Sequence, residues 1–176
     1  MPKPSARERI LDAYEQVVID QGPGVATLEG VAAQAGVSKG GLLYHFGSKD
    51  ALVDGLLERL ARLNEEDLEL ARQAPEGVVR YYLRSTITDV AENVPLNRTM
   101  TAAILLLSTE PRVSETLRRC SAAVREVMVA EVDDPLTAEL VVLVGDGLWL
   151  RAAMEGKESP ILGQVDAIIS RIEAQI

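Results

Sequence analysis

Residues 27–46 read Thr-Leu-Glu-Gly-Val-Ala-Ala-Gln-Ala-Gly-Val-Ser-Lys-Gly-Gly-Leu-Leu-Tyr-His-Phe, and this stretch decides the fold. Thr27 is a favourable N-cap for a helix of about eight residues, which Gly36 ends because glycine tolerates the positive φ of a tight turn. Ser38 can cap a second short helix that continues to about His45. Two short helices joined by a glycine turn are typical of a helix-turn-helix, although the same pattern also occurs as a purely structural helical corner.

The apolar residues of this motif are expected to fill the crossing between its two helices. Val31 and Ala32 of the first helix face Leu42 and Phe46 of the second in the predicted packing. The residues that remain for the outer face of the second helix, which can enter the major groove of DNA, are Lys39, Gly41, Leu43, Tyr44 and His45. Tyr44 has an alternative interpretation, as a side chain that packs into the core of the domain.

A helical period continues on both sides of the motif. Ser5 and Glu8 form a capping box at the start of a helix that Gly22-Pro23-Gly24 stops, and Gly47-Ser48 opens a long helix. Later prolines divide the rest of the chain into segments of roughly 15 to 25 residues, a length suited to single helices. The run Leu140–Leu150 is apolar enough for a buried strand. The periodic stretch around it, residues 137–155, is too long for a strand, and the sequence offers no partner strand. We therefore predict an all-α fold of about nine helices.

Charge is divided unevenly along the chain. The net charge is −9, which by itself argues against nucleic acid as a partner, yet residues 1–49 contain five basic and five acidic side chains. No acidic residue occurs between Glu29 and Asp50, and the whole negative excess lies in the remainder of the chain. A neutral N-terminal part followed by an acidic body indicates two functions within one chain.

The sequence contains none of the usual catalytic patterns. It has no glycine-rich phosphate loop, no His-Glu-x-x-His pair and no elbow serine. Cys120 is the single cysteine, which excludes an internal disulfide and a cysteine metal cluster. His45 is the single histidine, and no cysteine or acidic cluster lies near it to support a catalytic or metal-binding role. We predict that the protein is not an enzyme and that it holds no metal and no cofactor.

The predicted location is the cytoplasm. Residues 1–9 lack an apolar signal core, and the single cysteine fits a reducing compartment. The longest uncharged stretch, Thr99–Thr109, is far shorter than the roughly 20 residues that span a bilayer. We therefore expect no membrane partner.

Residues 35–49 and their surroundings resemble a known family. The run Ala-Gly-Val-Ser-Lys-Gly-Gly-Leu-Leu-Tyr-His-Phe-Gly-Ser-Lys, preceded by Thr27, resembles the DNA-binding domain of the tetracycline-repressor (TetR) family, and the resemblance covers roughly residues 6–53. It implies an N-terminal helix-turn-helix DNA-binding domain, here residues 1–47. It also implies a C-terminal helical ligand-binding and dimerisation domain, here residues 48–176.

The same resemblance implies roles for individual residues. It places on the DNA recognition helix the residues Lys39, Gly41, Leu43, Tyr44 and His45. It places Thr27, Ser38 and Lys49 where the family anchors the phosphate backbone. Two positions depart from the family pattern. Leu43 replaces a common tyrosine, so that an apolar contact with a thymine methyl group replaces a polar one, and Gly41 stands where a side chain is usual.

The acidic body has more apolar residues than one helix face requires. The segment 100–107 is apolar on more than one side, and helices of this kind lie centrally or line a cavity. Asp146 lies between two glycines in the most apolar segment, close to Trp149. It either faces solvent or a helix terminus, or lines a pocket in which a carboxylate and an aromatic wall bind a flat cation. The candidate ligand-binding residues are Leu63, Met100, Ile104, Leu107, Met128, Asp146 and Trp149.

Two C-terminal segments carry apolar stripes at helical spacing. The last one contains Ile161, Val165, Ile168, Ile169 and Ile172, and the one before it contains Leu140, Leu143, Val144 and Leu150. In the TetR family the last two helices pair with their counterparts, which implies a homodimer through these segments. The alternative is that the stripes pack inside one monomer.

These features predict a ligand-responsive transcriptional repressor. It is expected to bind double-stranded operator DNA as a homodimer and to be released by a small apolar or cationic inducer. The alternative is a TetR-like helical protein-interaction module without ligand-controlled DNA binding, in which Leu43 and Gly40-Gly41 are signs of a decayed recognition helix.

Overall fold

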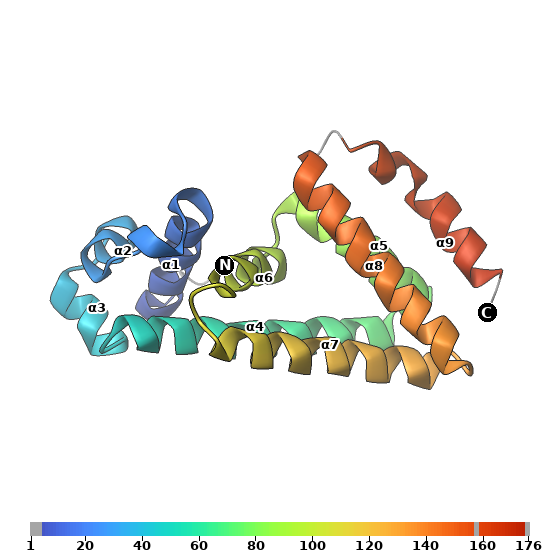
Figure 1. The fold of residues 1–176 in the computed structure, drawn as a ribbon, viewed down its shortest axis with the longest axis horizontal. Coiled ribbons are helices and arrows are strands. Elements are labelled where there is room, and N and C mark those ends of the chain that lie inside the picture. Colours follow the sequence, from blue (N-terminus) through green and yellow to red (C-terminus); the bar gives the residue numbers. More distant parts are fainter. Residues whose placement is uncertain (1–4, 157–158, 175–176) are drawn as a thin grey trace. The chain divides into compact units, whose positions relative to one another are not determined.

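The computed structural model describes residues 5–156 and 159–174, and every regular element within these two ranges is helical (Figure 1). The predicted all-α class is confirmed, with nine α-helices in the described ranges. The elements are α1 (Ala6–Gln21), η1 (a 3-10 turn, Pro23–Val25), α2 (Leu28–Ala35), α3 (Lys39–His45), α4 (Lys49–Gln73), α5 (Val78–Glu92), α6 (Pro95–Leu106), α7 (Arg112–Glu131), α8 (Pro135–Glu155), η3 (a 3-10 segment, Pro160–Gln164) and α9 (Val165–Glu173).

The chain divides into two compact units. The first contains residues 1–62 and 98–117, and the second contains residues 63–97 and 118–176. The helices α4, α6 and α7 therefore contribute residues to both units. The functional boundary between residues 47 and 48 stays a prediction, and the outermost residues of the two predicted domains lie outside the described ranges.

Side-chain caps and glycines set the helix boundaries of the first unit. The hydroxyls of Ser5, Thr27 and Ser38 each accept a hydrogen bond from the backbone N–H three residues further on, at 3.2, 3.1 and 3.0 Å. Gly22 and Gly36 follow α1 and α2 with φ of 87° and 65°, a region that favours glycine. Each of these caps and breaks was predicted from local sequence rules.

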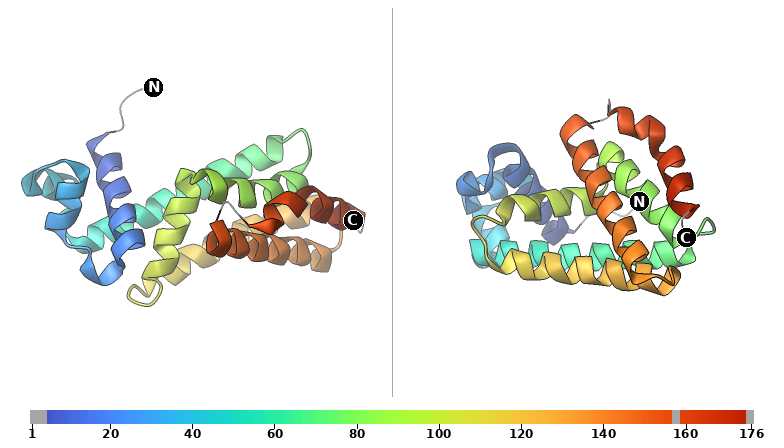
Figure 2. Two further views of the ribbon diagram at one scale, coloured as in Figure 1. Left: turned by 90° about the horizontal axis from the view of Figure 1, so that it is seen from above. Right: turned by 45° about the vertical axis from the view of Figure 1, so that its right-hand side comes forward.

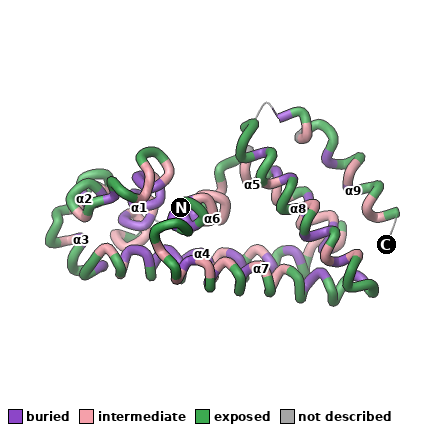
Figure 3. Tube along the Cα trace, in the orientation of Figure 1, coloured by how far each residue is buried: buried purple, intermediate pink, exposed green. Residues whose placement is uncertain are grey.

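The core of the first unit forms where α1, α2 and α3 pack on one another. The four residues predicted to fill the crossing of the motif, Val31, Ala32, Leu42 and Phe46, are all buried, whereas most of α2 and α3 is exposed (Figure 3). Gly55 of α4 makes room for this packing, because a Cβ atom there would lie 2.6 Å from Cε1 of Phe46. Close packing leaves no space for a larger residue at this position.

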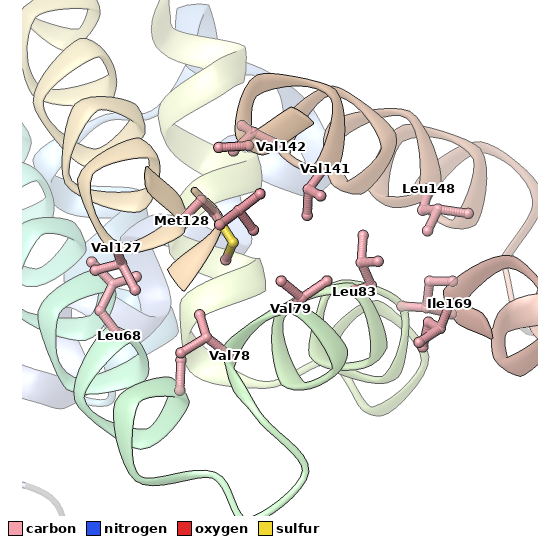
Figure 4. Close-up of a cluster of buried hydrophobic side chains, with 14 of the residues drawn as sticks. Leu68, Val78, Val79, Leu83, Val127, Met128, Val141, Val142, Leu148 and Ile169 are labelled. Atoms are coloured by element: carbon pink, nitrogen blue, oxygen red, sulfur yellow. The ribbon is translucent and has the colours of Figure 1, made fainter. Parts of the chain in front are cut away.

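In the second unit α5 packs against both α8 and α9 (Figures 1 and 2). Leu83 of α5, Val141 of α8 and Ile169 of α9 meet in its buried hydrophobic cluster (Figure 4). The α5–α8 contact is close at Gly145, where a Cβ atom would lie 2.4 Å from Cε1 of Tyr82. The first glycine of the unusual Gly-Asp-Gly segment therefore serves packing.

The two predicted apolar stripes have different surroundings. Val165 and Ile169 of α9 are buried in the core of the second unit, and Ile168 and Ile172 of α9 and Ile161 of η3 pack against it. This is the arrangement expected if the stripe packs inside one monomer. In α8 a row of apolar side chains at helical spacing is 53–77% exposed, namely Leu136, Leu140, Leu143, Leu150 and Met154.

Candidate functional site

The outward face of α3 carries the residues predicted to read DNA bases. Lys39, Leu43, Tyr44 and His45 are exposed, and Gly41 is half-buried. Tyr44 is 86% exposed, so its alternative interpretation as a core residue is wrong. Its ring meets the His45 imidazole edge-on, with the ring centroids 5.1 Å apart. A short helix thus leaves a cation, an aromatic pair and an apolar side chain accessible.

The ammonium of Lys39 is already paired in the structure. Its Nζ lies 2.6 Å from Oε1 of Glu29 in the first turn of α2, and both side chains are exposed. This contact lowers the pKa of the Glu29 carboxyl. Contact between Lys39 and a guanine therefore requires the ion pair to open or to be shared with the base.

The two hydroxyl residues predicted as phosphate anchors lie at helix starts. Thr27 and Ser38 are exposed N-caps of α2 and α3, and each uses a hydroxyl lone pair to accept a backbone N–H. The hydroxyl hydrogen can still be donated to a phosphate oxygen. A cap at the N-terminal end of a helix is also where anions are favoured.

Lys49, the third predicted anchor, has a structural partner. Its Nζ donates a hydrogen bond to the backbone carbonyl of Pro23 at 3.1 Å and is partly buried there. The bond ties the first residue of α4 to η1, on the far side of the helix-turn-helix in sequence. An ammonium has three donors, so this bond leaves capacity for a phosphate.

The predicted ligand-binding residues divide between the two units. Met100, Ile104 and Leu107 belong to the first unit, where Met100 is half-buried and the other two are exposed. The remaining four, Leu63, Met128, Asp146 and Trp149, belong to the second unit. Met128 is 0% exposed within the hydrophobic cluster of that unit, so it lines no open surface in this structure.

Asp146 is exposed, whereas Trp149 is half-buried. Partial loss of hydration raises the pKa of the Asp146 carboxyl, Glu139 adds to the rise, and Arg125 opposes it. The indole N–H of Trp149 donates a hydrogen bond to Oδ1 of Asn97 at 2.9 Å. Trp149 therefore has a polar partner on one edge, as buried tryptophans usually do.

Sequence reasoning missed a group of polar residues close to Asp146. Tyr81 donates a hydrogen bond to Oδ1 of Asp67 at 2.8 Å, and burial raises the pKa of the Asp67 carboxyl. Burial also raises the pKa of Tyr82, and the nearby charges of Asp146 and Asp67 raise it further. The signal available in the sequence was the Tyr81-Tyr82 pair, which contains two of only four tyrosines.

A small cavity of about 210 Å³ lies elsewhere in the second unit. Its lining is largely charged and includes none of the predicted ligand-binding residues: Glu76, Gly77, Val79, Arg80, Glu131, Val132 and Glu173. Drug-sized ligands occupy mostly apolar cavities of about 300–1,000 Å³, so this one does not fit an apolar inducer.

The described residues provide neither a metal site nor a membrane span. No group of three or more His, Cys, Asp or Glu side chains among them is placed to hold a metal ion. None of the described helices combines the length and the apolar character that a membrane-spanning helix requires.

An exposed recognition helix in an N-terminal helix-turn-helix, on an otherwise helical chain, defines a helix-turn-helix transcriptional regulator. The family model for "Bacterial regulatory proteins, tetR family" matches residues 10–56, and the model for "Tetracyclin repressor-like, C-terminal domain" matches residues 76–176. The chain therefore belongs to the tetracycline-repressor (TetR) family, whose members are transcriptional regulators rather than enzymes.

Individual proteins are similar to this chain over most of its length. The HTH-type transcriptional regulator BetI of Burkholderia mallei (strain NCTC 10229) is 26% identical over 173 residues, covering 89% of this chain and 88% of the relative. The multidrug binding protein EbrR, solved with malachite green, has a TM-score of 0.71 at 24% identity over 96% of this chain and 98% of that one. SmeT in complex with triclosan has a TM-score of 0.75 at 18% identity over 98% and 91% of the two chains. The two structures share the fold of this chain.

Proposed function

We propose that the protein represses transcription by binding operator DNA as a homodimer, with one α3 in the major groove of each half-site. The observation that carries this proposal is the outward face of α3, where Lys39, Leu43, Tyr44 and His45 are exposed while Leu42 is buried. Because the chain has a net charge of −9, its non-specific affinity for DNA is low and short-range contacts dominate. We expect it to act in the cytoplasm, without catalytic activity.

A gel shift on the DNA upstream of its own gene tests the proposal. We expect a shifted band that contains two chains per duplex and that disappears with the variant Tyr44→Ala. The helical protein-interaction module, the second candidate, predicts no shift and stable co-purification with another protein. It has weaker support, because the family models that match residues 10–56 and 76–176 describe bacterial regulatory proteins and a repressor-like domain.

The homodimer is proposed to form through the last two helices. The exposed row supports the α8 part of this interface, since Leu140 and Leu143 are 53% and 54% exposed and form part of a longer apolar stripe. Replacement of Leu143 by Glu should give monomers in analytical ultracentrifugation and abolish the gel shift. Leu70→Glu is the matched control, because Leu70 is 58% exposed on α4 and lies outside the stripe.

The inducer is proposed to be a small apolar or cationic molecule that contacts Leu63, Met100, Ile104, Leu107, Met128, Asp146 and Trp149. A buried residue such as Met128 takes part only in an opened arrangement, which the ligand would select from the existing population. A coupling of about 1–3 kcal/mol between the two sites would weaken operator binding roughly 5- to 150-fold.

Malachite green and triclosan are suitable probes because one is a cation and the other is not. Trp149 is the single tryptophan, so its fluorescence should be quenched at the concentrations of probe that release DNA. Asp146→Asn should weaken malachite green far more than triclosan. Unchanged affinity in both Trp149→Ala and Asp146→Asn would remove this site from consideration.

A further inference from the structure

Glu15 of α1 is a charged side chain with no exposed surface. Its Oε1 accepts hydrogen bonds from Nη1 of Arg59 on α4, at 3.2 Å, and from the hydroxyl of Thr99 on α6, at 2.5 Å. Its Oε2 accepts no hydrogen bond and lies 3.7 Å from Nε of Arg98 on α6. All four residues belong to the first compact unit. One carboxylate of α1 thus contacts two other helices.

This arrangement is costly for a purely structural role. Burial raises the pKa of the Glu15 carboxyl, and Thr99 and Arg59 only oppose that rise. Asp12 already satisfies part of the hydrogen-bonding capacity of Arg59. The Oδ1 atom of Asp12 accepts a hydrogen bond from Nη2 of Arg59 at 2.6 Å. Apolar residues of similar volume often stabilise a core as well as a buried ion pair does, whereas an ion pair fixes one relative orientation. The network therefore favours a role in orientation.

The position of Glu15 links the two proposed sites. Its own helix, α1, packs against α2 and α3 and so carries the recognition helix. Its partner Thr99 immediately precedes Met100, a proposed inducer contact on α6, and Ile104 follows one turn later. A displacement of α6 at Met100 cannot leave the hydroxyl of Thr99 in place.

We propose that Glu15 is a positioning residue for DNA binding, which holds α1 and the helix-turn-helix in the binding orientation through the hydroxyl of Thr99. The proposal rests on the proposed function and names the contact through which α6 controls it. Loss of the contact lowers the fraction of chains whose helix-turn-helix is oriented for DNA, and the apparent affinity falls by that fraction.

Four variants separate positioning from folding. Glu15→Gln keeps the shape of the side chain and removes its charge, and Thr99→Val keeps the shape of the threonine and removes its hydroxyl. Thr99→Ser restores the hydroxyl. Glu58→Gln is the matched control, because Glu58 forms an exposed ion pair with Arg7 at 2.9 Å between the same helices, α4 and α1. Exposed pairs of this kind contribute little.

Operator affinity is measured by titration of the duplex that the wild type shifts in the gel. The concentration of each variant is corrected for its folded fraction at the temperature of the titration. We expect Glu15→Gln and Thr99→Val each to bind the operator at least fivefold more weakly than the wild type. The double variant that combines these two substitutions should bind no more weakly than the weaker of the two single variants. Thr99→Ser and Glu58→Gln should stay within twofold of the wild type. Wild-type affinity in Thr99→Val, or effects that multiply in the double variant, would overturn the proposal.

Amide hydrogen exchange provides a readout that needs no DNA. Thr99→Val should speed exchange in α1 although the substitution lies on α6, while exchange in α5 and α8 stays unchanged. Unaltered exchange in α1 would contradict the positioning role. Failure of the wild type to shift any duplex would contradict the proposed function instead, and the exchange result would still decide the role of Glu15.

Discussion

The Nζ atom of Lys39 lies 2.6 Å from Oε1 of Glu29, so the candidate base-reading cation of the recognition helix is paired with a carboxylate of the preceding helix. Exposed ion pairs contribute little to stability, and both partners remain accessible to DNA. The carboxylate holds the ammonium and also repels phosphates. We therefore expect Glu29 to limit non-specific binding in a motif that otherwise has no acid up to Asp50.

Glu29→Gln should strengthen binding to a random-sequence duplex several-fold at low salt, because it releases Lys39 and removes a repelling charge. The gain should shrink as salt is raised, since exposed charges are screened. Fluorescence anisotropy at a series of salt concentrations measures both effects. Glu76→Gln removes the same charge from an exposed position in the second unit and should leave the affinity almost unchanged. Equal gains in the two variants would show that only net charge matters.

Lys39→Ala should weaken operator binding by about 1–3 kcal/mol and relax specificity at one base pair, because a lysine bonded to guanine O6 and N7 discriminates against the other bases. Titration of the operator and of its single-base variants measures this. Lys49→Ala is the comparison, since a phosphate contact carries no sequence information and its loss should weaken all duplexes alike. Uniform losses in both variants would contradict the role of Lys39.

Gly145→Ala should lower the free energy of unfolding by about 1–3 kcal/mol, because the new methyl group would overlap the ring of Tyr82 at 2.4 Å. Gly147→Ala adds the same methyl group two residues later on α8, where nothing lies within 4 Å, and should stabilise the helix by up to about 1 kcal/mol. Thermal unfolding of the two variants tests the close contact. Similar transition temperatures would show that α5 and α8 are not in contact at Gly145.

Tyr14→Phe should leave the protein at least as stable at neutral pH, because the Tyr14 hydroxyl is buried without a hydrogen-bond partner. Burial is the main cause that raises the pKa of Tyr14 to about 12, and Glu110 adds to the rise while Arg112 opposes it. An unfolded tyrosine ionises near pH 10, so the unfolded wild type loses a proton between about pH 10 and 12 while the folded state keeps it.

Stability contributed by neutral Tyr14 is therefore complete below about pH 10 and is lost as the pH rises toward 12. Denaturant unfolding at increasing pH should show that, above pH 10, the free energy of unfolding of Tyr14→Phe rises relative to that of the wild type. Tyr44→Phe is the control, because Tyr44 is 86% exposed and its loss should change nothing. An advantage of Tyr14→Phe that stays constant with pH would contradict the burial of this hydroxyl.

Local rules predicted the helix-turn-helix well, because Ser5, Thr27 and Ser38 act on backbone groups only three residues away. Periodicity alone could not tell which apolar stripe has a partner within the monomer. The stripes of α8 and α9 look alike in sequence, yet Ile169 is buried and Leu140 is exposed. That difference depends on the crossing of α5 with each helix, which the sequence of one segment does not contain.

The side-chain partners at the candidate sites could not be predicted from the sequence either. Glu29 and Lys39 are ten residues apart, and their contact depends on the angle between α2 and α3. The apolar character of Met128 predicts a pocket lining, but the structure buries this side chain in a packed cluster. The reason for Gly145 lies on another helix, at Tyr82. Contacts of this kind are set by tertiary packing.

Selection from a pool of random-sequence duplexes, followed by sequencing, tests most directly the claim that this protein is a sequence-specific, dimeric DNA-binding regulator. We expect enrichment of a palindrome whose half-sites are centred about one helical turn, or a multiple of it, apart, since two recognition helices must enter successive major grooves. The variant Leu143→Glu should enrich no palindrome. Recovery of unrelated sequences by the wild type, at an affinity no higher than that for the starting pool, would contradict sequence-specific binding by a dimer.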